Sequence, residues 1–97
     1  MYEIKFTPEA FGDLERYKKF EQKQVIEGIK ALLQDQPTTE NRNRKKLRPN
    51  QVAEWEQRID KFRIFYDTDE GSRIVKVVAI GHKEHNTLFI HGEEYEL

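Results

Sequence analysis

The chain has 97 residues, enough for one domain with a single hydrophobic core but not for two. It has no run of about 18 apolar residues and no signal peptide at its start, so we expect a cytoplasmic protein with no membrane partner. The lack of cysteine excludes disulfides and thiolate metal sites, and a net charge of −1 argues against a general nucleic-acid coat protein.

The N-terminal residues predict a strand that leads into a helix. Residues 2–6 alternate between apolar and polar side chains, which is the pattern of a half-buried strand. Thr7 is a suitable N-cap, and Pro8 suits the first helical position, where its missing N–H is not needed. The apolar stripe expected along this helix consists of Phe11, Leu14 and Tyr17.

A second helix is predicted next, antiparallel to the first, after a bend near residues 19–22. Its apolar positions follow the i, i+1, i+4, i+7, i+8 pattern of a helix that faces a core. Pro37 ends this helix, because the residue before a proline is pushed out of the helical region. The expected core positions are Val25, Ile26, Ile29, Leu32 and Leu33.

Residues 37–51 are polar and lack a clear period, so we expect a long loop. Within it, residues 42–48 carry five positive charges in seven positions. Since the whole chain has a net charge of −1, all other residues together carry −6. Such a basic block in an acidic chain is typical of a phosphate-facing patch, but a solvated loop that only keeps the protein soluble fits the composition equally well.

The second half of the chain predicts three antiparallel strands. Residues 53–59 and 62–66 form two strands joined by a tight connection, and residues 67–72 form a turn. Residues 73–80 begin with Arg73 and are then apolar on both faces apart from Lys76, as expected for a central strand. The order strand, helix, helix and three strands predicts an α+β fold in which the helix hairpin packs on one sheet face.

The sheet face that the helices leave uncovered is expected to collect polar groups. Arg58 and Arg63 lie on neighbouring strands, and His82, Lys83 and His85 arrive at the end of the last strand. Two arginines on adjacent strands form a fork-like site that is suited to a phosphate.

An alternative for the two arginines is a set of ordinary cross-strand ion pairs with Glu54, Glu56 and Asp60. Such surface pairs are common and contribute little stability. No metal site is expected, because His82 and His85 could share an ion only on a helix and the sequence places no third ligand near them. We therefore expect no cofactor.

Three segments resemble the RelE/ParE superfamily of bacterial toxins from type II toxin-antitoxin systems. They are Lys-Lys-Leu-Arg at 45–48, Lys-Phe-Arg-Ile-Phe-Tyr at 61–66 and Val-Val-Ala-Ile-Gly-His at 77–82. Together with the element order, they extend the resemblance over residues 2–90. The resemblance implies that residues 1–97 form a single RelE/ParE-like domain.

The RelE-like branch implies a toxin that enters the ribosomal A site and cleaves the mRNA there, an endoribonuclease (mRNA interferase) that inhibits translation without a cofactor. The resemblance also implies a cognate antitoxin that neutralises the toxin in a hetero-oligomer. Two other functions remain open. They are inhibition of DNA gyrase, as in the ParE-like branch, and RNA or partner binding without catalysis.

Cleavage of RNA without a metal requires a base for the 2′-OH, an acid for the leaving oxygen, cations for the phosphorane and a ring that holds the nucleobase. The resemblance assigns Arg58, Arg63 and Lys83 to the phosphate. His85-Asn-Thr-Leu-Phe89 is similar to the ending of the YafQ-like branch, in which the histidine transfers the proton and the phenylalanine contacts the nucleobase. The alternatives are a surface His85 without a role and a Phe89 packed in the core.

The basic block supplies the remaining predicted RNA contacts, which are Lys45, Lys46 and Arg48. Two positions depart from the family pattern. Phe89 replaces a catalytic tyrosine of some branches, and Glu56 occupies a position where a basic residue is often found. Residues 90–97 lie beyond the shared motifs, and they form either an extra strand or part of the antitoxin interface.

Overall fold

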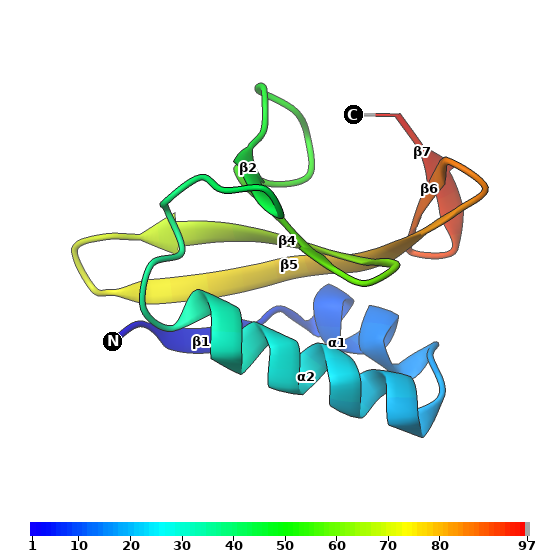
Figure 1. Cartoon of the computed structure of the whole chain (residues 1–97), viewed down its shortest axis with the longest axis horizontal. Helices are drawn as coiled ribbons and strands as arrows, with labels where there is room; N and C mark the ends of the chain where they lie inside the picture. Colours follow the sequence, from blue (N-terminus) through cyan, green and yellow to red (C-terminus); the bar gives the residue numbers. More distant parts are fainter. Residues whose placement is uncertain (97) are drawn as a thin grey trace.

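The computed structural model describes residues 1–96, and its two helices lie on one face of a seven-stranded sheet (Figure 1). The helices are α1 (Pro8–Glu15) and α2 (Lys19–Leu33). The strands are β1 (Glu3–Phe6), β2 (Arg44–Lys46), β3 (Trp55–Ile59), β4 (Phe62–Asp69), β5 (Ile74–Glu84), β6 (Thr87–Ile90) and β7 (Glu93–Tyr95). The strands β2 to β7 pair antiparallel in sequence order, and β1 pairs in parallel with the first part of β5. The predicted α+β fold is confirmed.

α1 begins as predicted but turns a different face to the sheet. The Ala10 N–H donates a hydrogen bond to Thr7 Oγ1 at 3.1 Å, and Pro8 occupies the first turn. The prediction of Phe11 as a core residue is wrong, since its side chain is 55% exposed, and Tyr17 lies beyond the helix. The sheet-facing side includes the buried Asp13, so a pattern of apolar residues does not identify this face. The buried positions are Ala10, Asp13 and Leu14.

α2 packs on the sheet through three of its five predicted core positions, which are Val25, Ile29 and Leu33. Ile26 is partly buried, whereas Leu32 is 39% exposed and does not belong to the core. The bend between the helices lies at residues 16–18, earlier than predicted. The reason is a cap, because the Lys18 N–H donates to Glu21 Oε1 at 3.1 Å and the helix starts directly after it.

The predicted loop at residues 37–51 is wrong in part, because it contains the edge strand β2. β2 pairs antiparallel with β3, with Arg44 opposite Gln57. Arg44 is 6% exposed, and its guanidinium donates to Gln57 Oε1 (2.8 Å) and to the carbonyl oxygen of Leu32 (2.6 Å). This member of the basic block therefore anchors β2 to the end of α2, while its neighbours on the strand stay exposed.

β4 and β5 are longer than predicted, because their pairing continues past residues 66 and 80. β5 runs to Glu84, and a register shift leaves Val78 without a partner on β4. His85 and Asn86, with φ of 51° and 68°, form the two-residue turn into β6. Positive φ at both positions is the backbone that such a tight hairpin requires.

The sheet face away from the helices carries a second, smaller core that the sequence did not predict. Tyr95 of β7 packs against it, so the C-terminal extension forms an extra strand, one of the two predicted alternatives. The buried members of this core are Phe65, Ala79, Leu88 and Ile90. Within residues 1–96, neither helix has the length and apolar character needed to cross a membrane.

Candidate functional site

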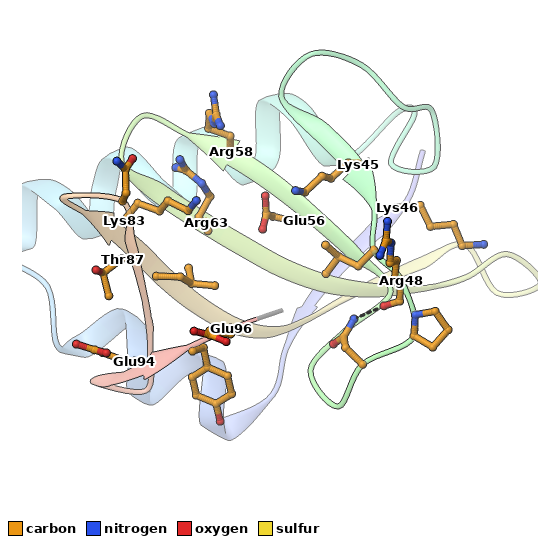
Figure 2. A pocket seen from close by; sticks show the side chains of 16 residues that line it. Lys45, Lys46, Arg48, Glu56, Arg58, Arg63, Lys83, Thr87, Glu94 and Glu96 are labelled. Carbon is orange, nitrogen blue, oxygen red and sulfur yellow. Dashed lines mark hydrogen bonds between the residues drawn. The ribbon is translucent and has the colours of Figure 1, made fainter.

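A basin of about 1000 Å³ opens on the sheet face away from the helices (Figure 2). β2 and the residues after it form one wall, β3 to β5 form the floor, and the β5–β6 turn with β7 forms the other wall. Three carboxylates line it, those of Glu56, Glu94 and Glu96, so six positive and three negative side chains leave a formal charge of +3. The six cations are Lys45, Lys46, Arg48, Arg58, Arg63 and Lys83.

Arg58 on β3 and Arg63 on β4 are directly opposite each other in the floor of the basin. Arg63 is 7% exposed, and its Nη1 donates to the carbonyl oxygens of Asp60 (2.9 Å) and Phe62 (3.0 Å). Burial, followed by the charge of Arg58, lowers the pKa of Arg63. Like charges placed opposite each other on neighbouring strands destabilise a sheet. An anion between the two guanidinium groups would offset this repulsion, so the pair is suited to a phosphate.

The alternative of cross-strand ion pairs is not found among residues 1–96. Glu54 Oε1 accepts a hydrogen bond from the Thr68 N–H at 3.2 Å and does not pair with either arginine. None of the basin cations takes part in an ion pair in this part of the chain. The ion pairs there are Lys5–Glu3, Lys23–Glu27, Lys61–Glu21, His82–Glu84 and His91–Asp13.

His85 and Phe89 do not join the six cations. His85 is exposed at the β5–β6 turn, and its neighbours Lys83 and Asn86 line the basin while His85 itself does not. Phe89 lies on the other sheet face, where its ring stacks on His82 with centroids 5.3 Å apart and planes at 15°. The structure therefore brings six of the eight predicted site residues together and leaves His85 beside them, at the turn.

The prediction that His82 reaches the uncovered sheet face is wrong. Its Nδ1 shares a hydrogen bond with Tyr17 Oη at 2.8 Å, on the side of the helices. Burial is the main cause that raises the pKa of Tyr17 to about 12, so its phenol stays protonated at neutral pH. β5 continues to Glu84 and so includes both His82 and Lys83. Because successive side chains of a strand alternate, these two side chains lie on opposite sheet faces. His82 thus ties the β5–β6 hairpin to the connection between the helices.

Sequence reasoning missed most of the uncharged lining and the wall formed by β7. Glu56 was not missed, because alternation along β3 places it on the same face as Arg58. No local signal existed for β7, because only its pairing with β6 brings it to the basin. Within residues 1–96, no group of three His, Asp or Glu side chains could hold a metal ion. The polar residues that were missed are Asn50, Asn86, Thr87, Glu94, Tyr95 and Glu96.

A family model described as ParE toxin of type II toxin-antitoxin system, parDE, matches residues 4–87. A chain of the RelBE2 toxin-antitoxin complex from Mycobacterium tuberculosis is similar in structure, with a TM-score of 0.73 and 24% identity, covering 84% of this chain and 98% of that chain. A chain of the archaeal RelE-RelB complex from Pyrococcus horikoshii OT3 is also similar, with a TM-score of 0.67 and 15% identity, covering 87% of this chain and 97% of that chain. No curated protein matches the sequence. At these identities, the two structures support the fold alone.

Proposed function

The chain belongs to the RelE/ParE superfamily of toxins from type II toxin-antitoxin systems, and we propose that it is a ribosome-dependent mRNA endonuclease that inhibits translation. The observation that carries this proposal is the arginine pair, Arg58 opposite Arg63, in the floor of a basin with six cations and three carboxylates. A phosphodiester suits two such guanidinium groups, because its oxygens match their forked donors.

In the proposed reaction the basin binds a single strand of mRNA in the ribosomal A site. Arg58, Arg63 and Lys83 hold the scissile phosphate and stabilise the charge that develops as the 2′-oxygen attacks it. His85, in the hairpin turn two residues after Lys83, transfers a proton to or from a reacting oxygen. Since DNA lacks the 2′-OH, the proposed chemistry is confined to RNA.

The outer cations, Lys45, Lys46 and Arg48, bind the phosphates that flank the cleaved bond in this proposal. Phe89 remains a candidate contact for a nucleobase. Its ring faces away from the basin, so a base would have to pass around the β5–β6 turn to reach it. Both structural relatives come from toxin-antitoxin complexes, which supports a cognate antitoxin as the partner of this chain in a hetero-oligomer. The cytoplasm is the compartment in which the proposed reaction on ribosomes would take place.

The proposal is tested by induced expression in bacteria followed by mapping of mRNA 5′ ends. We expect translation to stop and new 5′ ends to appear within translated messages, because the cleavage requires the ribosome. A matched culture that expresses Arg63→Ala is the control and should show few such ends. Growth arrest with intact mRNA and damaged DNA would contradict the proposal.

The second candidate function is inhibition of DNA gyrase, which the ParE-like branch implies, and the matching family model is described as a ParE toxin. The position of His85 outside the basin also favours it, because a protein that only binds gyrase needs no proton-transfer group. Two assays in vitro distinguish the two functions. A supercoiling assay with purified gyrase and a cleavage assay with ribosomes programmed with mRNA should give opposite answers for the same preparation.

A further inference from the structure

A single carboxylate lies in the middle of the basin floor. Glu56 of β3 is opposite Lys45 of β2, and Figure 2 shows it next to Arg63. Glu56 and Arg58 lie two residues apart on the same face of β3, and Arg58 is directly opposite Arg63, so Glu56 is a diagonal neighbour of Arg63 across the two strands. Within residues 1–96, the Glu56 carboxylate takes part in none of the side-chain hydrogen bonds or ion pairs, and the group is half-buried. Its oxygens are therefore open to the basin.

The proposed reaction needs a proton acceptor for the 2′-OH beside the phosphate. Lysine and arginine side chains carry hydrogen-bond donors and no acceptor, so the proton acceptors along the described lining are the three carboxylates. Glu94 and Glu96 lie across the basin, on β7 and just after it (Figure 2). Glu56 is thus the acceptor next to the arginine pair.

The positions of Glu56 and the hairpin turn also suit an in-line displacement, in which the attacking and leaving oxygens lie on opposite sides of the phosphorus. In Figure 2, Arg63 lies between Glu56 on one side and Lys83 on the other. Lys83 leads into the turn that carries His85. A phosphate on the arginine pair would therefore have a carboxylate on one side and an imidazole towards the other.

We propose that Glu56 is the catalytic general base of the cleavage, an inference that rests on the proposed function. A Glu56 carboxylate oxygen takes the proton of the 2′-OH, and the 2′-oxygen forms a bond to phosphorus. The bond between phosphorus and the 5′-oxygen breaks, and that oxygen takes a proton from the imidazolium of His85. The products are a 2′,3′-cyclic phosphate and a 5′-hydroxyl, and exchange with water restores both side chains.

Glu56→Gln tests the assignment, because it keeps the size of the side chain and removes the base. We expect single-turnover cleavage on ribosomes programmed with mRNA to fall by about 10²–10⁴-fold. Binding of a labelled single-stranded RNA should stay the same or become tighter, because a negative charge leaves the basin. Glu93→Gln is the matched control, since Glu93 is exposed on β7, outside the basin, and loses the same charge.

Chemical rescue separates a base from a residue with a structural role. In Glu56→Ala, added formate should restore part of the cleavage by supplying a carboxylate, whereas chloride at equal ionic strength should not. Full cleavage by Glu56→Gln, loss of RNA binding in that variant, or equal effects of formate and chloride would each overturn the assignment. If the wild-type protein neither binds nor cleaves the mRNA, the proposed function fails and the assignment falls with it.

Discussion

The clearest quantitative consequence of the basin is the salt dependence of RNA binding. For single strands, each phosphate contact contributes about −0.7 to the slope of log affinity against log salt concentration. The three outer cations each contact one flanking phosphate and the inner three share the scissile phosphate, so four phosphate contacts predict a slope of about −3. Replacing Lys45, Lys46 and Arg48 by alanine leaves the contact to the scissile phosphate and a slope of about −0.7.

The difference between the two slopes is large enough to measure. Between about 50 and about 200 mM KCl, the affinity of the wild-type protein should fall roughly 50-fold and that of the triple variant roughly 3-fold. Fluorescence anisotropy with a labelled single-stranded RNA gives both slopes. The fold should survive, because all three side chains are exposed and the β2–β3 pairing uses backbone groups.

A matched triple variant shows whether position or total charge matters. Lys19, Lys30 and Arg42 are exposed and lie outside the basin, so replacing them by alanine removes the same charge and should leave the slope near the wild-type value. Equal slopes for the wild-type protein and the Lys45, Lys46 and Arg48 variant would refute the reasoning. That result would mean that the basic block only keeps the protein soluble.

Three further predictions follow from single positions. His85→Asn should lower cleavage on ribosomes by about 10²–10⁴-fold without a change in melting temperature, because the side chain is exposed and asparagine suits the φ of 51° at this turn. Full activity of this variant would remove the histidine from the mechanism. His91→Gly should lower the free energy of unfolding, measured in urea, by about 1–3 kcal/mol. This change removes the 2.6 Å contact from His91 Nδ1 to the buried carboxylate of Asp13. Glycine is chosen because it adopts the φ of 57° at this turn position without strain. An unchanged unfolding curve would contradict the prediction. Gly81→Ala should lower the melting temperature, because its Cβ would lie 2.2 Å from the Phe89 carbonyl oxygen; equal calorimetric traces would show that β5 and β6 are not so close.

The features that could be predicted from the sequence are those that depend on neighbours along the chain. The core face of α2 follows from its helical period, which correctly places Val25, Ile29 and Leu33 in the core. The cap of α1 follows from the Thr7-Pro8 pair. Alternation along the strands correctly places Arg58 and Arg63 on one sheet face, so the centre of the candidate site was predictable.

Tertiary structure decided the features that depend on pairing between distant segments. The three residues of β2 are all charged, so no apolar pattern marks them as a strand, and only the register with β3 reveals it. The same pairing divides the basic block into a buried Arg44, which anchors the strand, and the exposed Lys45 and Lys46 of the basin.

The sequence by itself determined the family, the order of most elements and the cations of the site, because these follow from motifs and from local periods. Only the tertiary structure decided which sheet face receives His82 and Phe89. Val78 has no partner on β4, and this bulge shifts the register of β5. The strand then continues to Glu84, so the sheet face that each later side chain occupies depends on strand pairing and not on the neighbouring residues. For the same reason, the wall formed by β7 exists only once the β6–β7 hairpin has folded against the second core.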